Sequence, residues 1–467
     1  MTKKMSVCID LGLAAAFLLL YYVNAEIAKC IYLEQGWDIG IVNAMARYMS
    51  EGTMIGTHEY YAIYPNNVPI SYILCRLYEL AKKIPDYQYS YEFFWILVNC
   101  GMISVSGFTA CMTVKKVTAN PVAVLTAFVL YVGCVCVTPW KTAAYTDMYA
   151  IMFPILCICV YLYYSQMKSG MVRHLLWFLI LVLGFFGALI KPSVLVIVIA
   201  IVGIEIVKNL TAEKSRLIDL GVHLMLLVLT IILYYGYQQH IYNETEFVCN
   251  ENAAVTIHHY LLMGINEERT GSYDSGVLAF HGRFANPEER IPAQWEEYFR
   301  QLKERGMAGH IRFLLKKMVM TFNDGAFGWG REGNFEYFSY PIFSNAWYSP
   351  LLRDVFWPDF MYSGYFNTYS QFIWLVILGG IPGCCFYKKK DRHITVTIIL
   401  AILGVFLYLL LFETRARYLI CFLPVLITAS AVGMTQYYEW FIRGVGKVKS
   451  LRQQAARSND ECDKEST

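Results

Sequence analysis

The sequence predicts an all-α integral membrane protein, and three observations support this fold class. Of its 467 residues, 57% are hydrophobic and only 16% are charged, whereas about a quarter of the residues of a soluble domain are charged. Apolar runs of roughly 18 or more residues recur along the chain, and each is long enough to cross a hydrocarbon core of about 30 Å. The lysines and arginines fall mainly into every second segment between these runs, which is typical of short cytoplasmic loops.

The apolar runs predict about ten transmembrane helices. Six basic segments, among them "MTKK", "KKKDR" and "RGVGKVKSLRQQAAR", fall on one side of the membrane in this arrangement. Short basic loops stay in the cytoplasm, so both termini are predicted to be cytoplasmic. The membrane is expected to be the plasma membrane, or that of the endoplasmic reticulum in a eukaryote. The expected helices are residues 6–24, 91–113, 121–138, 148–165, 174–190, 193–207, 217–236, 369–387, 394–411 and 418–436.

Two long loops divide the chain into four regions. Residues 1–236 form an N-terminal transmembrane module that includes the first extracytoplasmic loop, and residues 237–368 form a second, larger extracytoplasmic loop. Residues 369–452 contain the C-terminal transmembrane helices, and residues 453–467 form a polar cytoplasmic tail. Both loops contain apolar residues at helical spacing, which predicts interfacial helices within them. One is expected to begin at residue 38, and another near residues 309–322.

Several classes of function are excluded by what the sequence lacks. The net charge is only +3, and no basic cluster is interleaved with aromatic residues, so a nucleic-acid partner is not expected. The 14 cysteines lie mostly inside apolar runs such as "GCVCV", where they are typical of small core residues rather than metal ligands or disulfides. Neither a GxGxxG nor a GxxxxGK[ST] element follows a strand, so no cytoplasmic nucleotide site is predicted.

Asp38 is the most conspicuous charged residue after the first predicted span, in "EQGWDIGIVNAMARYMSEG". An aspartate at the start of a helix commonly caps the backbone N–H groups and suits the helix dipole. A carboxylate held at the membrane surface can also act as a general base. The residue alone favours the cap, and the two roles are compatible. The helix that follows is expected to turn one apolar face toward the lipid, formed by Ile41, Met45, Tyr48 and Met49.

Three basic residues stand at the predicted extracytoplasmic ends of spans. Lys191 lies in "GALIKPSVLV", and Arg415 and Arg417 lie in "FETRARYLICF". Arginine binds phosphate oxygens in pairs through its planar fork, so contact with a phosphate group is one interpretation of these residues. The alternative for each is a side chain that extends to the membrane surface, or a local partner such as Glu413.

Asp147, in "YTDMYAI", is a further candidate at the same face. It is positioned to cap the fourth predicted span. The functional alternatives are that it orients an acceptor, binds a divalent cation or holds Lys141.

The second long loop offers weaker signals. His258 and His259 are adjacent and point apart on a helix, so zinc binding of the HxxxH type is absent. The segment "NDGAFGWGREGNFEYF" is an aromatic, glycine-rich turn. Trp329 within it is interpreted either as part of an interfacial aromatic belt or as a platform for a sugar, and the belt is favoured. Arg331 is a weak candidate for substrate contact.

The first loop resembles that of the GT-C superfamily of membrane glycosyltransferases, which take sugars from polyprenyl or dolichyl phosphates. The superfamily includes the protein O-mannosyltransferases and the bacterial aminoarabinose transferases. The resemblance rests on the aspartate that opens a surface helix after the first span, on "YYAIYPNNVPISYIL", and on the late segment "ETRARYLICFLP". It covers roughly residues 1–200 and 413–424.

The resemblance implies roles for individual residues. Asp38 matches the catalytic carboxylate of the family, and Asp147 matches its second external acidic residue. The family's adjacent Asp-Glu pair is missing, because Ile39 follows Asp38, so Glu34 is the alternative base. The remaining implied contacts are Tyr64 and His58 for the substrate, the acceptor or a metal, and Lys191, Arg415 and Arg417 for the lipid phosphate.

The function implied by the resemblance is transfer of a sugar from a polyprenyl-phosphate donor to an extracytoplasmic glycan, lipid or protein, with membrane lipids around the enzyme. No cofactor is required by the pattern, and a divalent cation stays open. A polysaccharide polymerase or ligase is one alternative. A multi-pass transporter or flippase of lipid-linked sugars is the other, although such proteins usually bury ionisable residues midway along their spans. Here Asp10, Glu205, Asp219 and His223 fall toward predicted cytoplasmic ends.

Overall fold

The computed structural model describes residues 2–85, 91–167, 170–211, 216–332, 335, 344–387 and 392–465. Within these ranges the regular elements are helices. The first half of the chain contains α1 (Lys3–Ile31), α2 (Trp37–Ser50), α3 (Glu59–Ile63), η1 (Pro65–Asn67), α4 (Val68–Lys82), α5 (Tyr91–Thr118), α6 (Pro121–Tyr131), η2 (Val132–Cys136), η3 (Pro139–Thr142), α7 (Thr146–Tyr149), α8 (Met152–Gln166), α9 (Met171–Ile190), η4 (Pro192–Val194) and α10 (Leu195–Leu210). The second half contains α11 (Arg216–Glu244), α12 (Ile257–Ile265), α13 (Ser275–His281), α14 (Pro287–Phe322), α15 (Ser349–Phe356), α16 (Ser363–Cys385), α17 (Arg392–Leu411), η5 (Ala416–Phe422) and α18 (Leu423–Glu465).

The predicted fold class is confirmed: the protein is an all-α bundle of membrane-length helices. Among the described residues, nine helical segments are long and apolar enough to cross a membrane. They correspond to nine of the predicted spans. The tenth, predicted at 121–138, is the shorter helical segment Pro121–Cys136, whose 16 residues span only about 24 Å at 1.5 Å per residue.

The short third span is completed by irregular backbone that is buried inside the protein. The segment after Cys136 forms η3 and then an extended stretch, and its residues are largely buried. The side chain of Asn99 donates hydrogen bonds to the carbonyls of Lys141, at 2.9 Å, and of Ala143, at 3.3 Å. Irregular backbone is stable at membrane depth only where the protein itself provides such partners.

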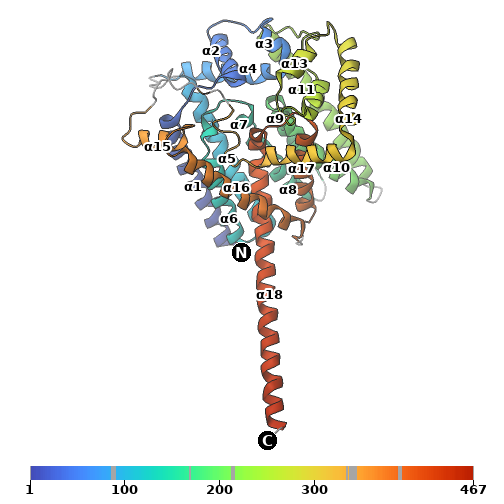
Figure 1. Cartoon of the computed structure of the whole chain (residues 1–467). Helices are drawn as coiled ribbons and strands as arrows, with labels where there is room; N and C mark the ends of the chain where they lie inside the picture. Colours follow the sequence, from blue (N-terminus) through green and yellow to red (C-terminus); the bar gives the residue numbers. More distant parts are fainter. Residues whose placement is uncertain are drawn as a thin grey trace.

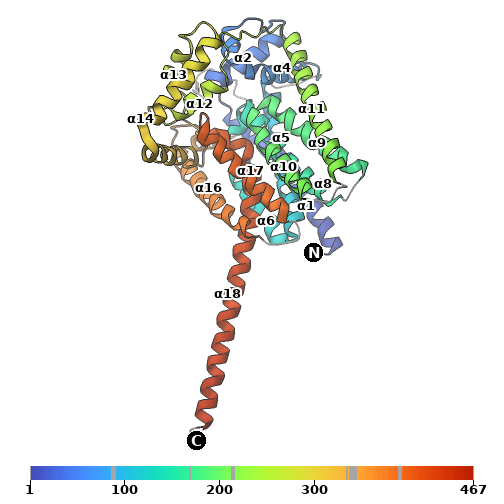
Figure 2. The ribbon, with the colours of Figure 1, turned by 90° about the vertical axis from the view of Figure 1, so that its right-hand side faces the viewer.

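Both chain termini lie at one end of the bundle, and α2, α3 and α4 cover the opposite end, which is called the far end below (Figure 1). Helices α12, α13 and the first half of α14 gather beside this layer (Figure 2). The last helix, α18, begins inside the bundle and continues beyond it through Glu465, so the predicted polar tail extends the last span as a helix.

Helices α16 and α18 pack closely at three glycines. A Cβ added to Gly433 would collide with the backbone carbonyl of Gly380, and one added to Gly383 would collide with that of Gly433. Small residues allow backbones in a membrane to approach in this way. The contact holds α16 and α18 close together.

Helix α2 confirms the predicted surface helix but corrects the face that it buries. Its buried residues include Met45 and Met49, whereas Ile41 and Tyr48 are exposed. The buried face packs against α4 rather than against lipid. Hydrophobic periodicity identifies an apolar face, but it does not say whether lipid or protein covers that face.

Helix α14 bends at Gly306, which has a φ of 61° that favours glycine. Its second half runs across the side of the bundle (Figure 1). Met307, Ile311 and Leu315 are exposed on this half, whereas Phe313 is buried. This pattern confirms the amphipathic helix predicted near 309–322.

Candidate active site

Asp38 lies in the first turn of α2 without capping it. The N-cap residue is Gly36, which makes no side-chain cap bond, and the helix begins at Trp37. The carboxylate of Asp38 turns instead toward α3, where its Oδ1 accepts a hydrogen bond from the Tyr60 hydroxyl at 3.0 Å. The capping interpretation is therefore wrong.

A chain of polar side chains continues from Asp38 into the protein. The Asn67 amide donates to the Tyr60 hydroxyl at 2.6 Å, and the Tyr145 hydroxyl donates to Asn67 Oδ1 at 3.5 Å. Burial is the main cause that raises the pKa of Tyr60 well above its usual range, followed by the neighbouring Tyr145 and Asp38. Tyr60 therefore remains a neutral donor that orients the carboxylate.

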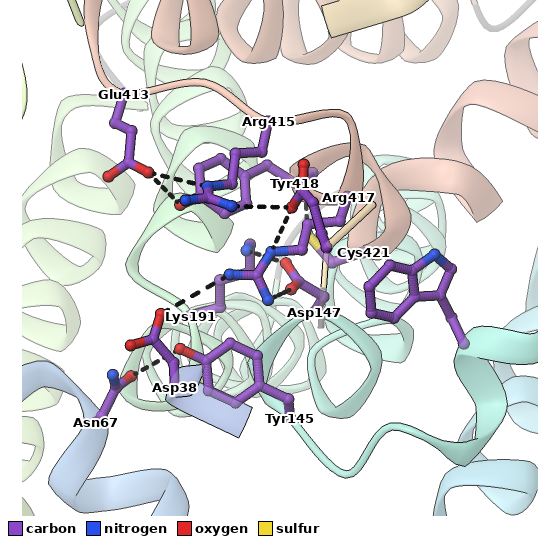
Figure 3. A network of polar contacts seen from close by, with 12 residues as sticks. Asp38, Asn67, Tyr145, Asp147, Lys191, Glu413, Arg415, Arg417, Tyr418 and Cys421 are labelled. Carbon is purple, nitrogen blue, oxygen red and sulfur yellow. Dashed lines mark hydrogen bonds and ion pairs between the residues drawn. The ribbon is translucent and has the colours of Figure 1, made fainter. Parts of the chain in front are cut away.

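Arg417 connects three carboxylates from distant parts of the chain, two of which, Asp38 and Asp147, are labelled in Figure 3. Its guanidinium lies 4.0 Å from Asp38 Oδ2, 3.7 Å from Asp147 Oδ2 and 3.0 Å from Glu332 Oε2. The Arg417 side chain is 8% exposed and Asp147 is 4% exposed, whereas Asp38 is 44% exposed. Asp38 is therefore the solvent-facing edge of a largely buried ionic cluster.

Asp147 is shared between Arg417 and Lys191, with which it forms a buried ion pair. The Lys191 ammonium also lies 4.6 Å from the centre of the Tyr418 ring. Two interpretations of Asp147 are corrected by these contacts. It makes no capping bond at α7, and Lys141 is bound elsewhere, by Asn24 Oδ1 at 2.6 Å and the Cys136 carbonyl at 2.5 Å.

Arg415 extends the cluster toward the second long loop. Its guanidinium lies 3.5 Å from Glu332 Oε2 and 3.2 Å from Glu413 Oε1. The local pairing with Glu413 that was considered from the sequence is thus present. The Tyr418 hydroxyl donates to the same Glu413 oxygen at 3.2 Å, and the Tyr273 ring lies 5.8 Å from the guanidinium.

The cluster of these seven charged residues carries a small negative excess. Four carboxylates against three cations give a net charge of −1. Burial raises the pKa of Glu332, while Arg417 and Arg415 act in the opposite direction. The members of this cluster are Asp38, Asp147, Glu332 and Glu413 with Lys191, Arg415 and Arg417.

The other predicted residues are not among the seven charged members of this cluster. Tyr64 is partly buried, and its ring lies 5.3 Å from that of Tyr60. His58 is exposed and caps α3, where its Nδ1 accepts from the Tyr60 backbone N–H at 3.3 Å. Arg331 and Glu34 are both exposed. Their contacts with a substrate stay predictions.

Several members of the site were not recognised from the sequence. Glu332 directly follows Arg331, so the sequence analysis identified the segment but not this residue. Tyr60 and Asn67 lie within the quoted "YYAIYPNNVPISYIL" segment. Trp329 is buried, and its indole donates to the Phe356 carbonyl at 2.6 Å, so neither the belt nor the sugar platform holds for it.

The site does not fit a divalent cation. Among the described residues, no group of three histidine, cysteine, aspartate or glutamate side chains is arranged to hold a metal ion. The two aspartates of the cluster already face cationic side chains, which would repel a metal. Bound cations in proteins need several oxygen ligands free to coordinate them.

Comparison with known proteins identifies a family. The model of the family described as "Conserved hypothetical integral membrane protein" matches residues 6–437. Among solved structures, the chain is similar to the archaeal oligosaccharyltransferase AglB from Archaeoglobus fulgidus, solved with an inhibitory peptide and a dolichol-phosphate, at 11% identity and a TM-score of 0.44. This similarity covers 92% of the chain and 52% of the AglB chain, so the protein spans about half the length of AglB. No curated protein matches the sequence.

Proposed function

We propose that this chain, which belongs to the family of conserved hypothetical integral membrane proteins, is a membrane glycosyltransferase of GT-C type. It would transfer a sugar from a polyprenyl-phosphate donor to an acceptor hydroxyl. One observation carries the proposal: the half-exposed carboxylate of Asp38 lies 4.0 Å from the buried guanidinium of Arg417. A candidate base and a candidate phosphate contact are thereby adjacent at the far end of the bundle.

The base is assigned to Asp38 because it is the accessible carboxylate of the cluster. In the reaction the acceptor oxygen forms a bond to the anomeric carbon of the sugar and loses its proton to Asp38. The bond from that carbon to the phosphate oxygen breaks, and polyprenyl phosphate leaves with the electron pair. The Tyr60 hydroxyl holds Oδ1 of Asp38, so the proton would go to Oδ2, which lies 4.0 Å from the Arg417 guanidinium. A positioned base of this kind accelerates a reaction about 10²–10⁴-fold.

The leaving phosphate is assigned to Arg415, Arg417 and Lys191. Fixed cations in a largely buried site stabilise developing negative charge more strongly than they would in water. The two guanidinium groups both contact Oε2 of Glu332, so they converge on one anionic group. We infer that the donor phosphate takes the place of this carboxylate.

The cluster is assigned to the extracytoplasmic face. The far end of the bundle lies opposite both termini (Figure 1). Lys115 and Lys116 lie in the last turn of α5, and Lys208 in that of α10, and both helices end away from the cluster. The predicted preference of basic loops for the cytoplasm then leaves the cluster outside. The residues of the cluster come from three of the four predicted regions. Glu332 comes from the loop at 237–368, and the others come from 1–236 and 369–452.

The test is a reaction of the purified protein in lipid nanodiscs with a panel of polyprenyl-phosphate hexoses. Release of polyprenyl phosphate that depends on an acceptor supports the proposal, and product analysis separates single-sugar transfer from polymerisation. Movement of intact donor across a vesicle membrane without release would favour the flippase instead. If no donor in the panel is consumed or moved, the proposal is wrong.

A further inference from the structure

A second site lies beside the ionic cluster, in the lobe formed by α12, α13 and the first half of α14. A cavity of about 490 Å³ opens between these helices and the turn at residues 266–274. Its volume falls within the roughly 300–1,000 Å³ that is usual for small-molecule sites. None of the seven charged residues of the ionic cluster lines it.

The cavity combines an apolar surface with many polar groups. Leu262, Val277 and Phe280 contribute the apolar part, and the amides of Asn266 and Gln301 face the same space. Five carboxylates and three guanidinium groups complete the lining, so its net charge is −2. Carboxylates accept hydrogen bonds, and amides and guanidinium groups donate them.

The charged groups of the cavity are only partly neutralised by one another. Arg300 lies 2.6 Å from Glu297 and 2.6 Å from Glu304. Arg305 lies 3.3 Å from Glu267. Glu268 pairs with none of the described basic residues, and it is exposed at the cavity. The excess of acceptors therefore remains available to a ligand.

The cavity is joined to the arginine segment by backbone hydrogen bonds. Glu413 N–H donates to the Tyr260 carbonyl at 3.1 Å, and Thr414 N–H donates to the Gly271 carbonyl at 2.9 Å. Tyr273 is 39% exposed and lies between Asp274, which lines the cavity, and Arg415, which its ring faces at 5.8 Å. The lobe that holds the cavity therefore contacts the segment that carries Arg415, through Tyr273 and these two hydrogen bonds.

We propose that this cavity binds a neutral or amine-bearing oligosaccharide, which serves as the acceptor. Sugar hydroxyls match a lining of carboxylates, amides and guanidinium groups, and the apolar face of a sugar ring matches the Phe280 side. The net negative charge disfavours anions, which separates this cavity from the place of the donor phosphate. The identification of the ligand as an acceptor rests on the proposed glycosyl transfer, but the binding of a saccharide does not.

The test is direct binding of three saccharide probes to the full chain in nanodiscs. Cellotetraose is the neutral probe, a chitosan tetramer is the cationic probe, and tetragalacturonic acid is the anionic probe. Saturation-transfer NMR is expected to show saturable binding of the first two and not of the third. Binding of none of them, or tighter binding of the anionic probe, would overturn the proposal.

Variants separate the cavity from other surfaces. Glu268→Gln and Arg283→Gln change exposed side chains of the cavity, and each is expected to weaken binding of the neutral cellotetraose about tenfold, as loss of a charged hydrogen bond does. Glu296→Gln is the matched control, because Glu296 is exposed on α14 and outside the cavity lining. An unchanged dissociation constant in Glu268→Gln and Arg283→Gln would also overturn the proposal.

The two proposals fail in different ways. If the saccharides bind but no polyprenyl-phosphate sugar is consumed, the cavity assignment stands and the proposed function falls. If transfer occurs and Glu268→Gln leaves both the KM for the acceptor and kcat unchanged, the cavity assignment falls alone. A rise in the acceptor KM without a change in donor affinity supports both.

Discussion

The carboxylate of Asp38 and the guanidinium of Arg417 lie 4.0 Å apart, which joins the first loop of the chain to the start of its last span. Arg417 is buried and is held by two further carboxylates, whereas Asp38 is open to solvent on one side. Asp147, the second aspartate that contacts Arg417, is buried, unlike Asp38. Asp38 is therefore expected to matter mainly for turnover, and Asp147 mainly for the stability of the fold.

Replacement of Asp38 by Asn is expected to abolish most turnover while the protein stays folded. The amide keeps the hydrogen bond to Tyr60 but cannot take the acceptor proton, so polyprenyl phosphate release should fall about 10²–10⁴-fold. Glu51→Gln, at the exposed C-terminal end of α2, is the control and should be unaffected. Full turnover in the Asp38 variant would remove it as the base.

Replacement of Asp147 by Asn is expected to destabilise the protein. Lys191 and Arg417 would lose a buried counter-ion, and breaking a buried pair typically costs about 3–5 kcal/mol. An exposed pair contributes only about 0–1 kcal/mol, so Asp38→Asn should unfold near the wild-type temperature. Thermal unfolding followed by tryptophan fluorescence compares the two variants. Equal melting temperatures would contradict the structural role of Asp147.

Replacement of Glu332 by Gln is expected to tighten binding of the donor. Burial raises the pKa of Glu332, so the folded protein takes up this proton more readily than the unfolded chain does. The contribution of Glu332 to the stability of the fold is therefore greatest at low pH and is lost as the pH rises through the raised pKa. The donor phosphate also displaces Glu332 from the two arginines most easily at low pH, because the protonated side chain carries no negative charge. Wild-type affinity for a polyprenyl-phosphate sugar, a diester whose charge is constant in this range, should rise as the pH falls.

The variant should lose this pH dependence and bind about tenfold more tightly at high pH. Surface plasmon resonance on nanodiscs at several pH values measures both effects. Glu59→Gln, at the exposed start of α3, serves as the control. If the affinity of Glu332→Gln for the donor still changes with pH, the titrating group is a residue other than Glu332.

The lobe of α12–α14 is expected to loosen in mild acid. Burial, followed by the neighbouring His281 and Arg290, lowers the pKa of His259 to about 3, from an ordinary value of 6.5. Below about pH 6.5 the unfolded lobe gains a proton that the folded lobe excludes, so the stability present above that pH is lost as the pH falls. The protection factors of the lobe's amides, which are the intrinsic exchange rates at each pH divided by the observed rates, should therefore be smaller at pH 5 than at pH 7.5. His259→Phe should reduce the difference, and an unaltered difference would contradict this origin.

The spans and most of the ionic cluster were predictable from the sequence, because both follow from local features. Hydropathy gives the spans, and the alternation of spans then places Asp38, Asp147, Lys191 and Arg417 at one end. Glu332 was not predictable, since it reaches the cluster through a loop whose path depends on tertiary packing. The start of α2 was also misjudged. The helix begins at Trp37 with a φ of 51°, a backbone geometry rare for a large side chain, and Asp38 is thereby moved out of the capping position.

The glycine contact between α16 and α18 restricts the movement of the segment that carries Arg417. Because Gly433 has no space for a side chain against Gly380, neither helix can rotate or slide past the other without a backbone collision. Arg417 lies in η5, the short helical segment that runs into α18, so its backbone is tied to the end of this fixed helix. A bulkier residue at Gly433 would therefore push α18 away from α16, and through η5 it would shift Arg417 relative to the carboxylates that hold it.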